Sequence, residues 1–299
     1  MGFLLRIAGA TIAVSILFSI VEPEKLSNAL ARSDIVFFFP AFLIAIASPL
    51  LTSVRLKLFL SATGTRVAYG HCLSASLCGL SLNLFLPARG GDLLKLAYLR
   101  KDGKPSWGIL AGAALLERGY DVLALGLIGL TMSLALELRD AAIISGSVAM
   151  AAVVGILILP RLSSLPIIGK KARNFSAIVK MTGQNKLRLV GCFAVCCICW
   201  TINSMIMGLL LKAFDETLSL AQALATTPPS ILAGIVPVSL WGVGTRDGAL
   251  AYFLQGFTAP ENAISAGFLY TVLVYWLLGL IGLPALLLAR RKTKTIPDD

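Results

Sequence analysis

Long apolar stretches separated by short polar segments make up most of this chain. Six of them approach or exceed about 20 residues, the length that an α-helix needs to cross a bilayer. They cover about residues 3–21, 35–54, 107–136, 141–160, 189–211 and 263–289. The pattern predicts an all-α, polytopic integral membrane protein with about six full transmembrane helices.

A seventh apolar stretch, about residues 67–99, is interrupted. Apolar residues run to Pro87, break at "PARGGD" and resume only for residues 93–99, with basic residues on both flanks. The positive-inside rule places both flanks in the cytoplasm, and the second arm is too short to cross. Irregular backbone at that depth needs protein or a water-filled cavity around it. We therefore expect a re-entrant helical hairpin.

An eighth stretch, about residues 220–257, follows the same logic from the other side. It starts on the outer face by the count of spans, breaks at residues 237–244 and resumes as a short arm. The last span must finish at the basic "RRKTK", so this hairpin begins and ends outside. Paired interrupted segments entering from opposite faces are typical of transporters with a site near the membrane midplane.

The composition agrees with a membrane protein. Of the 299 residues 57% are hydrophobic and 14% are charged, far more apolar than a soluble domain. We expect one transmembrane domain over residues 1–299, because no soluble catalytic domain fits beside the spans. The net charge of +11 does not indicate nucleic acid, since the basic residues cluster at the ends of apolar segments.

The basic residues instead predict topology. A long loop, about residues 161–188, carries seven lysines and arginines and no acid. This loop and both termini are expected on the cytoplasmic side of a bacterial inner membrane, with the loop on anionic lipid headgroups. The apolar run near the N-terminus is interpreted as an uncleaved span rather than a signal peptide.

The span 107–136 contains three charged residues in "LLERGYD", namely Glu117, Arg118 and Asp121. Each costs roughly 2.5 to 3.5 kcal/mol at a helix centre, so the helix is marginal unless they pair or face water. Buried groups of this kind are functional candidates, and a purely structural network is the alternative. Arg55 and Lys95 are expected to snorkel to the interface.

The two hairpin tips supply the candidate binding residues. Arg89 and Arg246 lie beside helix starts, where free backbone N–H groups favour anions. Asp92 and Asp247 would orient these cations. The backbone is expected to bend at hinge residues Pro87, Gly90, Gly91, Pro237, Gly242 and Gly244.

The remaining chemistry-bearing residues suggest no cofactor. Four of the six cysteines form "CFAVCCIC" within an apolar segment without histidine or carboxylate, which favours packing between helices over a metal site. His71 is the only histidine, and the chain has neither a nucleophile elbow nor a Walker A sequence. We expect no catalytic residue and no metal.

Three blocks carry a family resemblance: "NLFLPARGGDLLKLAYL", "LLERGYDVLAL" and "PVSLWGVGTRDGALAYF". They resemble the signature blocks of the flippase-like transmembrane family typified by the membrane domain of lysylphosphatidylglycerol synthases. Its pattern is matched by Asn83, Pro87, Arg89, Gly91 and Asp92 in the first block, by Glu117, Arg118 and Asp121 in the second, and by Pro237, Gly242, Gly244, Arg246 and Asp247 in the third. The family often has Glu where this chain has Asp92 and Asp247.

The resemblance implies a lipid translocase that moves a lipid with a polar, anionic headgroup, such as a phospholipid or a polyprenyl phosphate, with Asn83 joining the substrate-binding residues. No soluble aminoacyl-transfer domain follows, so synthesis of lysyl-lipid is not implied. Two alternatives stay open: a membrane-embedded transferase acting on a polyprenyl phosphate or glycolipid, and a non-transporting scaffold of a lipid-modifying complex. The identity of the lipid, the direction of movement, the energy source and the oligomeric state are left open.

Overall fold

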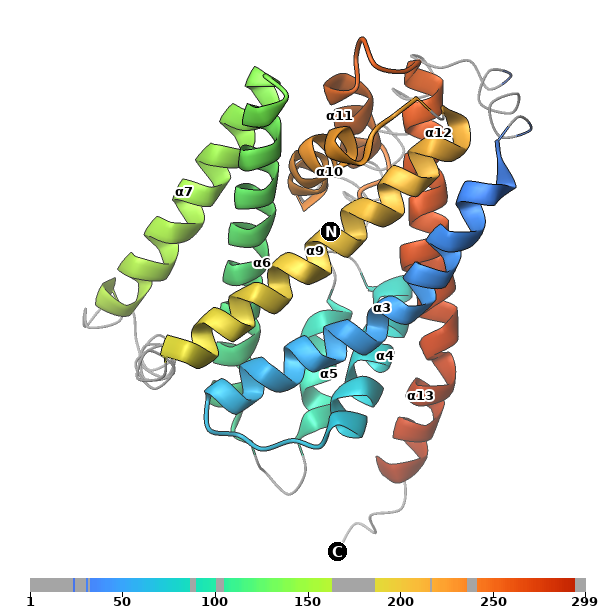
Figure 1. The fold of residues 1–299 in the computed structure, drawn as a ribbon. Coiled ribbons are helices and arrows are strands. Elements are labelled where there is room, and N and C mark those ends of the chain that lie inside the picture. Colours follow the sequence, from blue (N-terminus) through green and yellow to red (C-terminus); the bar gives the residue numbers. More distant parts are fainter. Residues whose placement is uncertain are drawn as a thin grey trace, which may run out of the picture. The chain divides into compact units, whose positions relative to one another are not determined.

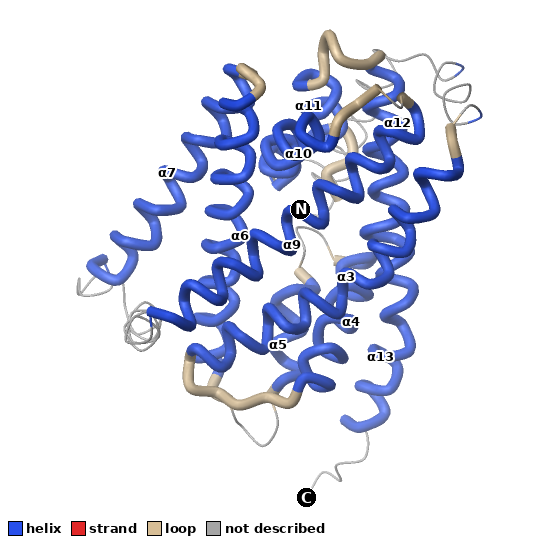
Figure 2. Tube along the Cα trace, in the orientation of Figure 1, coloured by secondary structure: helices blue, strands red, loops and turns tan. Residues whose placement is uncertain are grey.

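A computed structural model describes residues 24, 31, 33–86, 90–100, 105–162, 186–215, 217–235 and 241–293. These residues form helices joined by short loops, and no strand occurs among them (Figures 1 and 2). The predicted all-α class is therefore confirmed.

Four segments are long and apolar enough to cross a membrane. They are Ile35–Ala62, which is α3, Arg139–Ile158 within α7 (Arg139–Leu162), Leu187–Phe214 within α9 (Lys186–Phe214), and Pro260–Leu288. The last combines α12 (Pro260–Thr271), the π-helical turn Val272–Leu277 and α13 (Leu278–Thr293). The predicted first span, residues 3–21, lies outside the described residues, as does nearly all of the basic loop.

The helix α6 (Trp107–Ala135), with 29 residues, is as long as the longest of these four segments. It is absent from these four apolar segments because Glu117, Arg118 and Asp121 lower its hydropathy. A spanning role for α6 therefore depends on where these three side chains find partners.

Both interrupted segments fold as a longer helix, a break and a short helix. The first comprises α4 (Tyr69–Phe85) and α5 (Gly91–Leu99), and the second α10 (Leu220–Ile235) and α11 (Thr245–Phe253). Within each pair the two helices pack against each other. The breaks predicted from proline and glycine are thus confirmed to within a few residues.

The chain divides into two compact units, which are described separately. Unit 1 comprises Met1–Ala47, Val122–Met150 and Cys197–Trp276, and unit 2 comprises Ser48–Asp121, Ala151–Cys196 and Leu277–Asp299. Each unit contains one of the two helix pairs, with α4 and α5 in unit 2 and α10 and α11 in unit 1 (Figure 1).

Unit 2 is held together by close helix contacts at glycines. A Cβ on Gly282 of α13 would lie 2.2 Å from the carbonyl oxygen of Leu77 of α4, and Ser81 donates to the carbonyl of Gly279 at 2.7 Å. A Cβ on Gly91 would lie 2.3 Å from the carbonyl oxygen of Gly79, so only glycine lets α5 approach α4 this closely. Small residues at such contacts are the usual means of helix association in membranes. An apolar core of residues from α3, α4, α5 and α6 packs nearby, including Leu56, Leu60, Leu96, Leu99 and Leu110.

Unit 1 also has a close helix contact at a glycine. Gly126 of α6 packs on Ala149 of α7, where an added Cβ would lie 2.8 Å from the Cβ of Ala149. Ser133 donates to the carbonyl of Ala225 at 3.0 Å, which ties α6 to α10. Close packing therefore joins α7 to α6, and a hydrogen bond from a hydroxyl group joins α10 of the second helix pair to α6.

Candidate functional site

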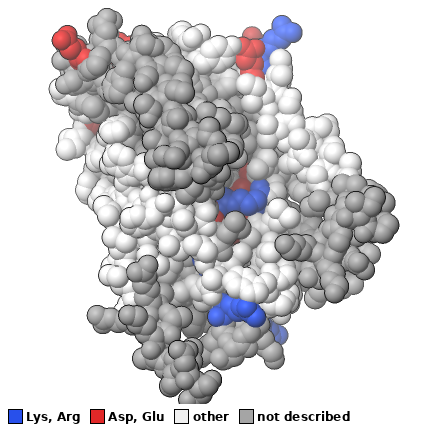
Figure 3. All heavy atoms as spheres, turned by 180° about the vertical axis from the view of Figure 1, so that it is seen from behind, with Lys and Arg blue, Asp and Glu red and all other residues white. Residues whose placement is uncertain are grey.

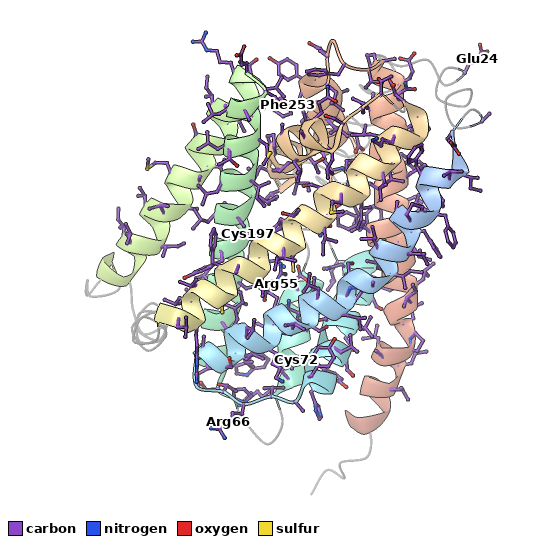
Figure 4. All side chains as sticks on the ribbon, in the orientation of Figure 1. Glu24, Arg55, Arg66, Cys72, Cys197 and Phe253 are labelled. Carbon is purple, nitrogen blue, oxygen red and sulfur yellow. The ribbon has the colours of Figure 1, made fainter. Side chains whose placement is uncertain are left out.

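Six charged side chains of unit 2 form one cluster, which we call the unit-2 charge cluster. Three helices supply it: α3 gives Arg55, α5 gives Asp92 and Lys95, and α6 gives Glu117, Arg118 and Asp121. The spacing of Glu117 and Asp121 places both on one face of α6, and α5 brings its two members to that face. Figure 4 shows the α3 member, Arg55.

The inner part of the cluster is buried. Arg55 donates to Glu117 Oε1 at 2.7 Å and to Asp121 Oδ1 at 2.6 Å. The Nζ of Lys95 lies 3.5 Å from both carboxylate oxygens of Glu117, whose side chain is 2% exposed. Two cations from two helices therefore meet one carboxylate, and α3 and α5 are both tied to α6.

The outer part of the cluster is accessible. Arg118 donates to Asp92 in an ion pair whose side chains are 36% and 19% exposed. Arg118 Nη1 also lies 3.6 Å from Asp121 Oδ2, and the amide of Asn83 donates to Asp92 Oδ1 at 3.3 Å. This pair joins the start of α5 to the middle of α6, next to the break that carries "PARGGD".

The cluster is electrically balanced among the described residues, with three cations and three carboxylates. A charge taken out of water loses several kcal/mol of solvation, which only close partners of opposite sign offset. The pairing therefore explains how α6 carries three charges in an apolar helix. The alternative of a structural network, weighed from the sequence, is consistent with these contacts, and a functional role can coexist with it.

Two members of the cluster were misjudged from the sequence. Arg55 and Lys95 were expected to snorkel to the interface, and this is wrong because both are buried and paired with Glu117. A sequence signal existed for Arg55, since an arginine within a long apolar segment needs a carboxylate partner, and Glu117 and Asp121 were the obvious candidates.

Unit 1 holds a second, smaller arrangement around Arg246 of α11. The side chain of Arg246 is 2% exposed. Its Nε donates to Asp247 Oδ1 at 2.8 Å, and its Nη2 donates to the carbonyl of Gly267 at 2.6 Å and to Thr271 Oγ1 at 2.7 Å. The guanidinium carbon also lies 4.9 Å from the centre of the Tyr270 ring. Nη1 is buried without a hydrogen-bond partner in the described part of the chain.

The backbone before α11 explains how Arg246 becomes enclosed. Gly242 and Gly244 have φ of +79° and +91°, which favours glycine, and Asp247 accepts from the N–H of Gly244 at 3.3 Å. A Cβ on Gly234 would lie 3.0 Å from the Cβ of Arg246, and one on Gly267 would lie 2.3 Å from Asp247 Oδ1. Gly267, Tyr270 and Thr271 were missed from the sequence, because nothing in "SAGFLYT" distinguishes a packing position from a ligand.

The other predicted site residues fall into two groups. Pro87, Arg89 and Pro237 lie outside the described residues. Gly90 and Gly91 stand at the start of α5, where Gly91 is required by close packing rather than by its φ. Among the described residues no group of three or more histidine, cysteine or acidic residues is placed to hold a metal ion, and Cys197 of the "CFAVCCIC" segment, labelled on α9 in Figure 4, is a free thiol.

Comparison with known proteins gives two matches. Residues 3–282 match the family model described as the lysylphosphatidylglycerol synthase TM region. The chain is also similar to a UPF0104 membrane protein from Methanothermobacter thermautotrophicus, with 22% identity over 320 residues that cover 95% of this chain and 94% of the relative. Both matches span nearly the whole chain, so both units and both interrupted segments belong to the shared region.

Proposed function

The chain belongs to the family of the lysylphosphatidylglycerol synthase TM region, and we propose that it is a translocase that moves a lipid with an anionic headgroup between the leaflets of a membrane. In this proposal the charged and polar side chains serve the headgroup, while the acyl or prenyl tails stay in lipid. The architecture proposed is six full spans with α4–α5 and α10–α11 as re-entrant hairpins entering from opposite faces.

The observation that carries the proposal is the accessible ion pair of Arg118 and Asp92. Arg118 is the twelfth of the 29 residues of α6, about 17 Å from the first residue at 1.5 Å per residue. An arginine side chain that is 36% exposed at this position in a proposed spanning helix needs water or a headgroup beside its charge. On the face that Figure 3 shows, most of the described surface is uncharged, with charged atoms in only a few places. A polar passage is the simplest reason to keep an accessible ion pair there.

The distribution of the other charges supports the proposed topology. In unit 2 the exposed charged side chains that are described are Lys57, Arg66, Arg100 and Arg188, all basic. In unit 1 the exposed or half-buried charged residues near helix ends are mostly acidic, namely Asp34, Glu137, Asp140, Asp215 and Glu261, and the basic ones among them are Arg139 and Lys212. Basic residues mark cytoplasmic ends, so we propose that the ends of α3, α4 and α9 in unit 2 face the cytoplasm, with both termini and the loop 161–188 on that side.

Transport is proposed rather than catalysis, because the carboxylates of the unit-2 charge cluster are engaged with cations and only Asp92 is accessible. His71, the only histidine of the chain, is exposed on α4 and is not a member of the unit-2 charge cluster. A general base needs an accessible lone pair within reach of the proton that it removes.

Arg89 and Asp247 keep their proposed roles at the hairpin tips, whereas the contacts of Arg246 favour a different role from the direct headgroup binding expected from the sequence. Arg246 would reach a headgroup only through Nη1, since its other nitrogens are bound within unit 1. We therefore propose that Arg246 mainly fixes the tip of α11, and that Arg118 of α6 and Arg89 of the first hairpin make the direct contacts with the anionic head.

A lipid inventory tests this function. The full chain is purified from its membrane, and the bound lipids are quantified by mass spectrometry against bulk membrane. Enrichment of one anionic lipid in the wild type, lost in Arg118→Gln and in Arg89→Ala, supports translocation. A composition equal to the bulk membrane argues for the scaffold alternative, and turnover of a bound polyprenyl phosphate or glycolipid without movement argues for the transferase.

A further inference from the structure

The helix α10 of unit 1 contains two consecutive buried prolines, Pro228 and Pro229. A proline has no N–H, so the carbonyls of Leu224 and Ala225 lose the partners that a regular helix would supply. Ser133 of α6 replaces one of these partners, because its hydroxyl donates to the carbonyl of Ala225 at 3.0 Å. The middle of α10 therefore presents backbone oxygen to the helices around it.

Unit 1 also contains three buried hydroxyl groups that have no hydrogen-bond partner in the described part of the chain. They belong to Ser145 of α7, Ser204 of α9 and Thr227 of α10, and all three residues are 0% exposed. A buried hydroxyl without a partner costs folding free energy. Three of them in one unit therefore require an explanation.

The hydroxyl of Ser145 lies beside the prolines of α10. A Cβ on Gly129 of α6 would clash with Ser145 Oγ and would lie 3.3 Å from Pro228 Cβ. Ser145 and Pro228 therefore pack against the same glycine, which brings a side chain of α7 to the middle of α10.

The hydroxyls of Ser204 and Thr227 approach the same part of α10 from the side of α9. Residues 215–219 connect α9 to α10, and a connection this short makes the two helices antiparallel neighbours. A Cβ on Gly208 would lie 2.9 Å from the Cβ of Ala223. Ser204 is one turn before Gly208 and Thr227 is one turn after Ala223, so both belong to the next layer of this contact.

The carbonyl of Leu224 lies between these hydroxyl groups. The side chain of a helical residue leans over the turn before it, which places the Thr227 hydroxyl near the carbonyl three residues earlier. The ring of Pro228 also abuts that carbonyl, because a helical proline meets the carbonyl four residues before it. Four neutral oxygens therefore gather at the middle of α10: the carbonyl of Leu224 and the hydroxyls of Ser145, Ser204 and Thr227.

Carbonyl and hydroxyl oxygens are the ligands that hard cations prefer. In membrane transporters, the carbonyls of interrupted helices and the C-terminal ends of half-helices coordinate Na⁺. The first half of α10 ends at the prolines, where the negative end of its dipole favours a cation. A site of this kind needs no histidine, cysteine or carboxylate among its ligands.

The turn between α6 and α7 is suited to attract a cation to this part of unit 1. Glu137 and Asp140 are exposed there, with the exposed Arg139 between them, so the turn has a net negative charge. Ser133 lies one turn before Glu137, and Ser145 lies five residues after Asp140. A negative surface raises the local concentration of cations.

We propose that the middle of α10 binds one Na⁺ through the carbonyl of Leu224 and the hydroxyls of Ser145, Ser204 and Thr227. Neutral ligands suit a monovalent ion, because a divalent ion needs carboxylates to offset its charge. The close packing at Gly129 and Gly208 favours the smaller Na⁺ over K⁺. Binding involves no lipid, so the inference goes beyond the proposed function and does not rest on it.

Thermal unfolding tests the site. The purified full chain, in a neutral detergent without added lipid, is melted in NaCl, KCl or N-methylglucamine chloride at one ionic strength. An ion that binds only the folded protein raises the midpoint as its concentration rises. We expect this rise with Na⁺ and not with the other two cations, and saturable binding of radioactive Na⁺ to the same sample.

Variants assign the ion to its ligands. Thr227→Val keeps the shape of the side chain and removes the hydroxyl, and Ser145→Ala removes a ligand from another helix. Each should raise the Na⁺ concentration of the half-maximal response at least about tenfold. The control is Ser265→Ala, because the buried Ser265 of α12 donates within its own helix, to the carbonyl of Glu261 at 2.7 Å; it should respond to Na⁺ as wild type does.

Each variant is compared with itself in the three salts, so a loss of stability common to all of them does not count. Thr227→Ser keeps a hydroxyl and should keep the Na⁺ response, which covers the case in which Thr227→Val does not fold.

The outcomes separate this inference from the proposed function. Equal midpoints in the three salts, as expected where water fills the space between the hydroxyls, overturn the site, and so does equal stabilisation by Na⁺ and K⁺. An unchanged Na⁺ response in folded Thr227→Val and Ser145→Ala overturns the assigned ligands. Because no lipid is present, each of these results leaves translocation standing, and a failure of lipid movement in vesicles leaves the Na⁺ site standing.

Discussion

The two interrupted segments have similar sequences and different surroundings. Both combine glycines, an Arg and an Asp at the start of a short helix. In unit 2 the Asp of that helix pairs with Arg118, which lies 26 positions further along the chain, and the pair is accessible. In unit 1 Arg246 binds Asp247 and the backbone of α12, and the side chains of both residues are 2% exposed. The comparison teaches that one sequence pattern can lead to an accessible ion pair or to a buried one, depending on which helix packs over it.

The largest expected effect on stability comes from removing one partner of the buried ion pair of Arg246 and Asp247. Arg246→Leu leaves the Asp247 carboxylate buried without its cation, which should cost about 3–5 kcal/mol of folding free energy. The double variant Arg246→Leu, Asp247→Asn removes both charges and should recover much of that loss. Denaturation by SDS in mixed micelles measures both. A double variant as unstable as the single one would contradict a buried ion pair.

Replacing a glycine by alanine tests the close helix contacts around each of the two short helices, α5 in unit 2 and α11 in unit 1. Gly267→Ala places a Cβ 2.3 Å from Asp247 Oδ1, and Gly91→Ala places one 2.3 Å from the Gly79 carbonyl oxygen, and both distances are clashes. Overpacking of this kind costs about 1–3 kcal/mol. Gly155→Ala is the matched control, because a Cβ there meets nothing within 4 Å.

The glycine variants should differ in transport. Gly91→Ala moves α5 and therefore Asp92, so lipid movement should fall even where the protein remains folded. Gly267→Ala should lower transport only in proportion to the folded fraction. Equal residual transport per folded molecule in the two variants would contradict the claim that the two interrupted segments differ in function.

Features that depend on residues close together in the sequence could be predicted, whereas features that depend on residues far apart in the sequence could not. The breaks before α5 and α11 depend on Pro and Gly within a few residues, so they were predicted closely. The burial of Arg55 depends on Glu117, 62 positions away, and on helix packing that no local pattern encodes. The enclosure of Arg246 depends on Gly267 and Thr271 of another helix, so a residue predicted at a binding tip proved to be held within unit 1.

A smaller effect on stability is expected at the accessible pair. Arg118→Gln removes a partly exposed ion pair, which is worth about 1 kcal/mol or less, so this variant should fold nearly as well as wild type. Its transport should nevertheless be lost. The contrast with Arg246→Leu, measured in the same SDS titration, separates a functional cation from a structural one; a loss of stability as large as that of Arg246→Leu would contradict the distinction.

The smallest expected effect lies outside the spanning segments, at Asp215 between α9 and α10. Hydrogen bonds from Thr217, and one from Thr258, hold the pKa of Asp215 below its usual range against partial burial. A depressed pKa contributes stability that is present above the unfolded pKa and is lost as the pH falls through the folded pKa. Asp215→Asn should therefore melt slightly below wild type at about pH 7, and the difference should shrink as the pH falls below about 4, the ordinary pKa of an aspartate. A difference that persists at low pH would exclude ionisation as its cause.

The most direct test of the central claim follows an anionic lipid across a bilayer. Vesicles of phosphatidylcholine containing a trace of phosphatidylglycerol with a fluorescent acyl chain are reconstituted with wild type or with Arg118→Gln at equal protein content, and an impermeant quencher reports the label that reaches the outer leaflet. The account predicts that wild type exposes the inner label well above the rate of protein-free vesicles, and that Arg118→Gln does not. Movement no faster than in protein-free vesicles, or equal rates for wild type and Arg118→Gln, would contradict it.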